Sequence, residues 1–394
     1  MSKSGKMLIA FTIIASLCIT PAVYLPNDNT SGELYDDVML GDYAISQAKS
    51  DEIKEKVVEV SSIESFSSVR SNSIVEINAS LSNSLNAAEY QEALENCISA
   101  GTPVISLNGA AAFTAPELSI PTAFVSDATA TGVYYNNSTG AVSCYSVKCD
   151  SQTEAVNRVY AWADEMLSAD TTSVEIIALS SAANGSPSWG SEIQSYADIE
   201  CGDYGWFYIR TNYFEQITNS DTYRYYKPDY KLQAVPNSST NARIADMNVQ
   251  CDVDKLRSTQ RLLDYGPTTT SGSSSASVSL NWSVSESGAS VGMSTERSYS
   301  ISDIMVHDYS NFGNELFSTS HDVQESGSVG DTAILIKPGL VSSSEKSSSN
   351  GGYSVEDNYS VNFCKYQKSG SLPWSPYTCQ NYHLFYTTLN VNIP

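Results

Sequence analysis

Three histidines are the side chains of this sequence best suited to acid–base or metal chemistry. They are His307, His321 and His383, and two of them precede an aspartate, in His307-Asp308 and His321-Asp322. If these two pairs lie on neighbouring strands, two imidazoles and a carboxylate could converge on a metal ion. Adjacent residues on a strand point to opposite faces, however, so neither pair can give both side chains to one site. Surface histidines with turn aspartates are the alternative, and His321 as the base of a serine hydrolase is another.

The sequence contains none of the motifs that identify the common catalytic centres. It has no GxSxG elbow, no GxxxxGK phosphate loop, no GxGxxG dinucleotide loop and no HExxH. It therefore gives no catalytic residues and implies no cofactor. We expect a protein that is not an enzyme, with an extracellular hydrolase as the third hypothesis for its function.

The cysteines indicate disulfides formed outside the reducing cytoplasm. Of the eight, Cys18 falls in a predicted signal peptide, and Cys97 lies on a predicted helix and is expected to be a free thiol. Pairs close in sequence are favoured among the remaining six, although spacing alone cannot fix connectivity. The predicted pairs are Cys144–Cys149, Cys201–Cys251 and Cys364–Cys379.

A tyrosine-rich segment between residues 204 and 235 is a candidate binding surface. Two long strands are predicted there, about an Asn-Ser-Asp turn. Exposed aromatic side chains could stack on sugar rings or lie at a membrane interface, and the alternative is a strand pair with large buried side chains. The candidate binding residues are Trp206, Tyr208, Tyr213, Tyr223 and Tyr225, with Arg210 and Arg224 between them.

Residues 275–301 alternate between apolar and small polar residues over two predicted strands. Such a hairpin could cross a membrane, pairing with copies from other subunits to close a barrel. A half-buried strand of a soluble sandwich gives the same alternation. The apolar positions are Val278, Leu280, Trp282 and Val284 in the first strand, and Val291 and Met293 in the second.

The elements that must position these residues indicate an α+β, multidomain protein. A strand at 74–77, a capped helix at 86–100 and a strand at 104–107 predict a β-α-β unit. A hairpin at 133–147, a second capped helix at 151–167 and a strand at 174–179 extend it. Beyond residue 189 the helical patterns end, which predicts an antiparallel β-sandwich or barrel-like domain. The expected order is a signal peptide (1–22), a linker or stalk (23–70), a small α/β domain (71–188) and an all-β domain (189–394).

The N-terminus and the composition both indicate export. Lys3 and Lys6 precede an uncharged apolar run, which is the form of a secretory signal peptide, and a retained membrane anchor is the alternative. The net charge of −23 argues against nucleic acid and anionic lipid surfaces as partners. Several N-x-Ser/Thr sequons would carry glycans in a host that attaches them. We expect a secreted or cell-surface protein whose partner is a glycan, a surface protein or a membrane, with oligomers as an option.

Two resemblances accompany these patterns. SVSLNWSVS (277–285), SYSISDIMVHDYS (298–310), the Lys-Pro-Gly at 337–339 and the stretch from 74 to 105 resemble uncharacterised exported proteins of archaea and bacteria. That resemblance covers most of residues 70–365, implies an exported or surface protein of unknown role, and gives no catalytic residues to carry over. Residues 205–365 are also similar in texture to leukocidin-like β-barrel pore-forming toxins, which implies membrane insertion. The preceding α/β region departs from that family.

The first expectation for function is therefore an exported, non-enzymatic binding or structural protein. The alternative is a β-barrel pore former that inserts residues 275–301 into a membrane. A dye-release assay on liposomes separates the two.

Overall fold

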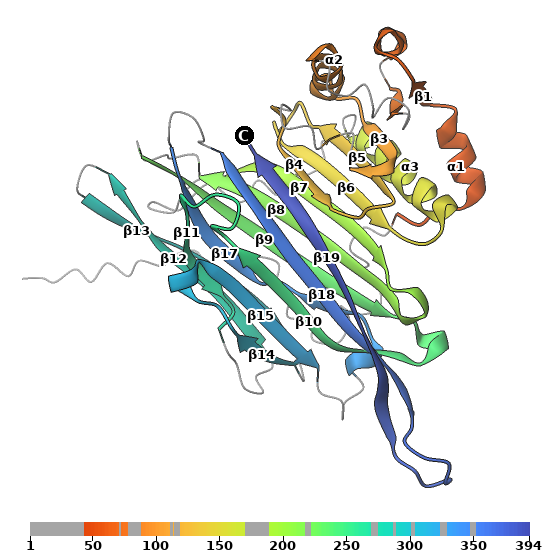
Figure 1. The fold of residues 1–394 in the computed structure, drawn as a ribbon, viewed down its shortest axis with the longest axis vertical. Helices are drawn as coiled ribbons and strands as arrows, with labels where there is room; N and C mark the ends of the chain where they lie inside the picture. The colour runs from red at the N-terminus through yellow and green to blue at the C-terminus, as the bar shows by residue number, and fades with distance from the viewer. Residues whose placement is uncertain are drawn as a thin grey trace, which may run out of the picture.

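The structure is a computed structural model of a two-layer β-sandwich with a helical region at one end (Figure 1). For residues 275–286 and 289–300 the structure describes the backbone. The described residues are 43–70, 72–77, 88–110, 113, 119–169, 189–216, 222–268, 275–286, 289–300, 304–323, 329–346 and 352–394. The predicted signal peptide and the strand predicted at 174–179 lie outside them.

The larger sheet has eleven strands in the order β1-β2-β3-β5-β6-β7-β8-β9-β17-β11, with β16 beside β9. Strands β1, β2 and β3 are parallel, as are β6 and β7, and the other pairs are antiparallel. The strands are β1 (Val57–Val60), β2 (Ile74–Ile77), β3 (Val104–Ala110), β5 (Ala130–Tyr135), β6 (Val142–Lys148), β7 (Trp189–Glu200), β8 (Gly205–Gln216), β9 (Tyr223–Pro236), β11 (Gln260–Gly266), β16 (Ile334–Ile336) and β17 (Gly339–Glu345).

The smaller sheet is antiparallel throughout, in the order β14-β15-β10-β18-β19-β4. Its strands are β14 (Ile304–Asp308), β15 (Leu316–Val323), β10 (Ala242–Asp252), β18 (Tyr353–Lys368), β19 (Tyr377–Ile393) and β4 (Thr122–Val125). The two sheets share one core, in which Leu232 of the larger sheet and Val361 of the smaller are buried. The predicted antiparallel sandwich is confirmed.

Three α-helices and several short 3-10 turns complete the described chain. The helices are α1 (Gln47–Lys54), α2 (Ala88–Ser99) and α3 (Gln152–Ala169), and the turns are η1 (Ile63–Ser68), η3 (Gly202–Tyr204), η4 (Ser238–Thr240), η5 (Phe312–Asn314) and η6 (Val329–Asp331). Within the described residues we find no helix with the length and apolarity needed to span a membrane.

The predicted β-α-β unit is present as β2-α2-β3, with its two strands parallel. The helix predicted at 151–167 is α3, and the Ser151 hydroxyl accepts a hydrogen bond from the Glu154 N–H at 3.3 Å, as its capping pattern predicts. Strands β5 and β6 form the predicted hairpin.

Part of the segment expected to be a linker is folded. Helix α1 and strand β1 lie within residues 47–60, and β1 pairs with β2. The apolar stripe of α1 is thin, but its Ile53 is buried in the same cluster as Val159 and Trp162 of α3. This apolar contact, together with the ion pair between Lys49 and Asp164 of α3 at 3.8 Å, docks the short helix.

The α/β region is joined to both sheets of the sandwich. Strand β6 pairs in parallel with β7, and β4 pairs with residues 389–392 of β19. In Figure 1 the helices lie at one end, beside these strands. The larger sheet is therefore continuous from the helical region into the sandwich.

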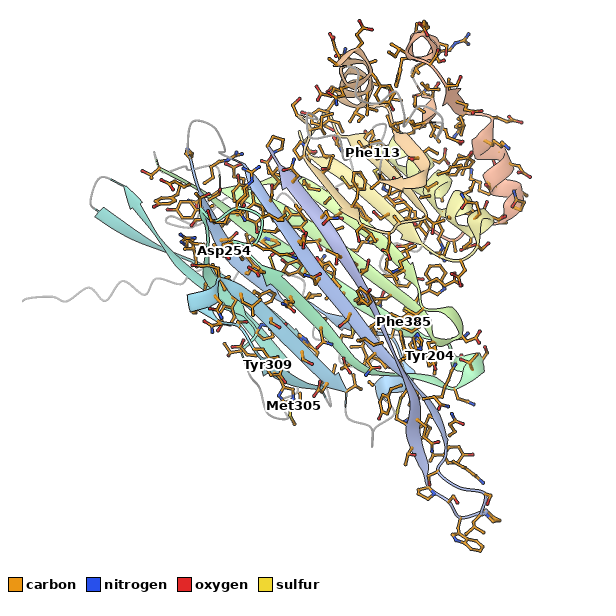
Figure 2. All side chains as sticks on the ribbon, viewed as in Figure 1. Phe113, Tyr204, Asp254, Met305, Tyr309 and Phe385 are labelled. Atoms are coloured by element: carbon orange, nitrogen blue, oxygen red, sulfur yellow. A yellow bond between two sulfur atoms is a disulfide. The ribbon has the colours of Figure 1, made fainter. Side chains whose placement is uncertain are left out.

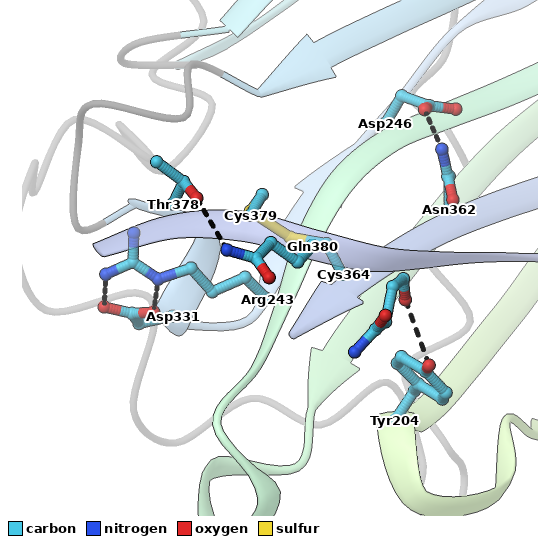
Figure 3. The surroundings of a disulfide bond; sticks show 10 residues. Tyr204, Arg243, Asp246, Asp331, Asn362, Cys364, Thr378, Cys379 and Gln380 are labelled. Atoms are coloured by element: carbon cyan, nitrogen blue, oxygen red, sulfur yellow. Dashed lines mark hydrogen bonds and ion pairs between the residues drawn. A yellow bond between two sulfur atoms is a disulfide. The ribbon is translucent and has the colours of Figure 1, made fainter. Parts of the chain in front are cut away.

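One predicted disulfide forms and two do not. Cys364 and Cys379 are bonded between β18 and β19, with Cα atoms 5.4 Å apart (Figure 3). Cys97 is free, as expected. Cys144 and Cys149 are separate thiols because five residues of extended chain span about 16 Å and place the two side chains on opposite faces.

The prediction of a Cys201–Cys251 disulfide is also wrong, since both thiols are free and buried. Cys201 lies near the start of β10, where the Asn237 N–H donates to the Tyr204 carbonyl and Ala242 follows. Cys251 lies on β10 nine residues after Ala242, which places it roughly 30 Å from the start of that strand. The sandwich thus holds the two sulfurs toward opposite ends of a long strand.

Candidate functional site

Strands β12 (Ser275–Glu286) and β13 (Ala289–Ser300) form a hairpin of their own. The pairing is continuous from Ser275↔Ser300 to Glu286↔Ala289, and this two-stranded sheet is separate from the two larger ones. In Figure 1 it lies beside β11 and β17 and extends past the end of the sandwich. The hairpin predicted at 275–301 is confirmed as a backbone structure.

The register brings the apolar positions of the two strands together. Trp282 is opposite Met293 and Val284 is opposite Val291. The intervening positions are polar or small, with Ser283 opposite Gly292, Asn281 opposite Ser294 and Ser279 opposite Glu296. Cross-strand partners in an antiparallel pair share a face of the sheet. One face of the hairpin is therefore largely apolar in sequence. It is interrupted by Arg297 opposite Val278, by Thr295 opposite Leu280 and by Glu286 opposite Ala289 next to the turn.

A second hairpin, β18–β19, extends beyond the sandwich and ends in an aromatic tip (Figure 1). We use "the tip" for residues 365–380. Trp374 is 77% exposed, and Leu372 and Tyr377 are also more than half exposed. Such an apolar cluster is unusual on a protein surface and indicates a contact with a membrane or another molecule. Sequence reasoning missed this feature, although no Asp or Glu follows Asp357 in this very acidic chain.

The base of the tip is fixed to the sandwich by a small set of contacts. The Tyr204 hydroxyl donates to the Asn381 carbonyl at 3.0 Å, and its ring packs on Phe385 (Figures 2 and 3). The Lys365 ammonium lies 4.3 Å from the Tyr204 ring centre and donates to the Asp203 carbonyl at 2.8 Å. Together with the disulfide, these contacts hold the hairpin in one direction relative to the sandwich.

The tyrosine-rich hairpin proposed for binding is β8–β9, and most of its candidate side chains are covered. Tyr208, Tyr213, Tyr225 and Arg210 are buried, Trp206 and Arg224 are half-buried, and Tyr223 is at the margin of exposure. One face of this strand pair is packed in the core shared with the smaller sheet, and on the other face Arg158 of α3 lies over Trp206. Of the predicted binding set, Tyr223 is thus the residue most open to solvent.

A buried charge network covers the helical side of β8. Asp198 of β7 accepts from Arg158 of α3 at 3.0 Å and from Arg210 of β8 at 2.7 Å. The Tyr145 hydroxyl also donates to it, at 2.9 Å. The Arg158 guanidinium lies 3.8 Å above the Trp206 ring centre. Arg210 and Trp206 therefore help to fasten α3 to the sandwich.

On the other side, Tyr213 belongs to a polar cluster in the core of the sandwich. Its hydroxyl donates to the buried Asp357 carboxylate, as do those of Tyr230 at 3.1 Å and Tyr359 at 3.3 Å. Burial raises the pKa of Asp357, and hydrogen bonds from these tyrosines and from Cys251 oppose the rise. This cluster is closed to solvent and joins the two sheets.

The histidine hypothesis fails on geometry. Strands β14 and β15 do lie side by side, but His307 is opposite Ser320, so His321 lies on the other face of the sheet. His321 is buried, which lowers its pKa to about 3 and keeps it neutral. His307 instead pairs with Asp322 at 3.1 Å. In the described part of the chain we find no group of three side chains that could hold a metal.

Comparison with known proteins gives matches only at the level of structure. No protein-family model and no curated protein sequence matches this chain. Similar solved structures include Clostridium perfringens delta-toxin (9% identity, TM-score 0.38, 54% of this chain and 96% of that one). A protein described as a pore forming protein (9%, 0.32, 53% and 94%) and the Clostridium perfringens NetB toxin in the membrane inserted form (8%, 0.26, 50% and 95%) also match.

Proposed function

We propose that this protein forms pores in membranes. The β12–β13 hairpin would leave the side of the sandwich and pair with hairpins from other copies to close a transmembrane β-barrel. The observation that carries the proposal is the hairpin's separation from both sheets, combined with its alternating sequence. A strand pair that belongs to no larger sheet can move with the loss of few main-chain hydrogen bonds.

The dimensions of the hairpin suit a bilayer. Each strand has 12 residues. At about 3.3 Å per residue and a tilt near 40°, such a strand covers about 30 Å along the membrane normal, which is the thickness of the hydrocarbon core. The hairpin is therefore long enough to cross without help from neighbouring segments.

The chemistry of the two faces also suits a barrel. A closed barrel pairs every main-chain group, which lipid requires. Val278, Leu280, Trp282 and Val284 would face lipid, and the intervening Ser and Asn residues would line the aqueous lumen. Arg297, opposite Val278, would lie between the midplane and the interface on the open side of the hairpin, where a lipid-facing cation costs less than at the midplane.

The tip supplies a surface for the first contact with the membrane. Trp and Tyr side chains favour the membrane–water interface, where the rings reach apolar depth and their polar atoms stay hydrated. Trp374 and Tyr377 are exposed at the end of the tip, and Lys368 is the only other charged residue there besides Lys365. The tip would thus approach lipid without the repulsion that the rest of this acidic chain experiences at anionic surfaces.

Release of dye from liposomes by a matched pair of variants tests the proposal. Leu280→Arg places a charge on the lipid side, at a cost of about 2–4 kcal/mol per copy near the midplane. Asn281→Arg places the same charge on the lumen side. We expect Leu280→Arg to abolish release and Asn281→Arg to retain most of it. Equal activity of the two variants, or no release by the parent chain on any lipid mixture, would contradict pore formation.

A secreted or surface-bound binding protein is the second candidate, and the exposed tip favours it. Trp374 and Tyr377 could stack on sugar rings of a glycan instead of entering lipid. Binding of the parent chain to a glycan array, lost in Trp374→Ala and unaccompanied by dye release, would support this function.

A further inference from the structure

The smaller sheet has two edges that pair with no further described strand for part of their length, and on one of them the Tyr386 carbonyl accepts from the Lys148 ammonium at 3.4 Å. Among the described strands, β14 pairs with β15 alone. On its side away from β18, β19 pairs with β4, and this pairing covers residues 389–392. Figure 2 shows Met305 of β14 and Phe385 of β19 on opposite sides of this sheet. Edge strands are natural sites for the addition of another strand.

These two edges lie at the same level of the sheet. Met305 is opposite Asp322, which is opposite Asp246. Asp246 is opposite Asn362, which is opposite Leu384. By the same register His307 is level with Tyr386. An adjacent copy held at equal height would therefore bring its β14 beside this part of β19.

The direction of the main chain suits such an addition. The Tyr309 N–H donates to the Ser318 carbonyl at 2.9 Å, so odd-numbered residues of β14 face β15 and Val306 faces outward. On β19, the Thr388 carbonyl accepts from the Ser126 N–H at 3.0 Å, so the even-numbered residues face outward. Four antiparallel steps separate β14 from β19, which makes the two strands parallel.

A parallel ladder places an outward-facing residue opposite an inward-facing one and bonds it to the neighbours of that residue. Val306 of one copy, opposite Phe385 of the next, meets this requirement. Its N–H and C=O would bond to the Leu384 C=O and the Tyr386 N–H. The side chains of Val306 and Phe385 would then both face the core side, as they already do within their own sheets.

The contact would reduce the solvent exposure of two large side chains of β19. Leu384 is 57% and Tyr386 73% exposed, on the outer face of β19. Met305 and His307 are half-exposed on the outer face of β14 and would lie beside them on the same face of the sheet. By this register Asp308, the last residue of β14, is level with Thr387. Hydrogen bonding of β19 to the β4 segment begins at the next residue, Thr388, so the added strand would end directly below β4.

We propose that copies of this chain join head to tail, with β14 of one adding in parallel to residues 384–387 of β19 of the next. The partner is a second copy of this chain, and the inference rests on the pore-forming function proposed above. Two different surfaces meet in each contact, and such an interface generates a ring when the rotation closes. The ring would bring the β12–β13 hairpins together, since β13 leads into β14 along the chain.

Disulfide trapping between copies tests this contact. The double variant Met305→Cys/Leu384→Cys places thiols at facing positions, and Met305→Cys/Tyr377→Cys moves one thiol more than 20 Å along β19. Each is oxidised on liposomes, run on a non-reducing gel and assayed for dye release, with the parent chain and its native thiols as the background. We expect a ladder of covalent oligomers for the first pair and none for the second.

The outcomes separate this contact from pore formation itself. Dye release without a ladder in the first pair would overturn the contact and leave pore formation standing, and so would equal ladders in both pairs. If the first pair gives no dye release and no ladder, both proposals are overturned. As a second variant, Val306→Pro removes one outward N–H and leaves the bonds of β14 to β15 intact. It should reduce oligomers at least tenfold while the monomer unfolds as a cooperative unit.

Discussion

Strand pairs β8–β9 and β18–β19 are both long antiparallel hairpins rich in aromatic residues, yet solvent reaches them very differently. In β8–β9, Tyr208, Tyr213 and Tyr230 are fully buried. At the far end of β18–β19, Trp374 and Tyr377 are exposed. The difference shows that aromatic content in strands does not identify a binding surface. What decides is whether another layer of the protein covers the face.

The cover over β8–β9 comes from two distant parts of the chain. Helix α3 contributes Arg158, which lies over Trp206, and β18 contributes Asp357, which accepts from Tyr213. The tip extends past both sheets, so neither layer reaches it (Figure 1). The same residue types therefore stabilise the fold in one hairpin and remain available for contact in the other.

The largest expected contrast is in stability. Tyr213→Ala removes a buried ring and a hydrogen bond to Asp357, and should lower the free energy of unfolding by about 3–5 kcal/mol. Tyr377→Ala removes an exposed ring and should change it by less than about 0.5 kcal/mol. Urea denaturation followed by fluorescence measures both values. Similar losses of unfolding free energy in the two variants would contradict the claim that Tyr213 stabilises the fold and Tyr377 does not.

Membrane binding should show the reverse order. Trp374→Ala removes the most exposed aromatic side chain of the tip and should weaken binding to liposomes by about 10- to 100-fold, given about 1.5–3 kcal/mol for burying such a side chain. Its unfolding curve should match that of the parent. Vesicle co-sedimentation gives the affinity. Unchanged binding would mean that the tip does not touch lipid.

A smaller effect concerns pH, because β8–β9 packs against the buried carboxylate of Asp357, whereas the tip contains no carboxylate. The pKa of Asp357 is raised by burial above its unfolded value of 3.8. Its contribution to stability is thus fully present below pH 3.8 and is lost as the pH rises through the raised pKa, by up to about 1.4 kcal/mol per pH unit. In Asp357→Asn this loss is absent.

Urea denaturation of the parent and of Asp357→Asn at several pH values between 3.5 and 7 checks this expectation. The difference in unfolding free energy should shift in favour of the variant as the pH rises. A difference that stays constant over this range would show that Asp357 remains ionised in the folded protein.

Local patterns predicted the local structure well. The alternation over 275–300 predicted the β12–β13 hairpin, and the Ser151/Glu154 pattern predicted the start of α3. The Cys364–Cys379 bond was also predictable, because its cysteines lie on strands joined by a short connection. Each of these features depends on residues within about 30 positions of one another.

Features that depend on distant partners were not predictable. Burial of β8–β9 requires Asp357 and α3, which lie more than 35 residues away in sequence. The free state of Cys201 and Cys251 follows from where β10 lies in the sandwich. The exposed tip could have been found from its lack of acidic residues, but its extension past both sheets depends on where the other strands end.

Fluorescent labelling along β12 tests the central claim most directly. Single cysteines at consecutive positions from 278 to 284 would carry an environment-sensitive dye, and emission would be recorded in solution and on liposomes with a lipid-phase quencher. Pore formation predicts an alternation on liposomes. Positions 278, 280, 282 and 284 should shift to the blue and be quenched, and positions 279, 281 and 283 should remain aqueous. Emission that does not change on liposomes, or changes without alternation, would contradict insertion of this hairpin as a β-barrel strand.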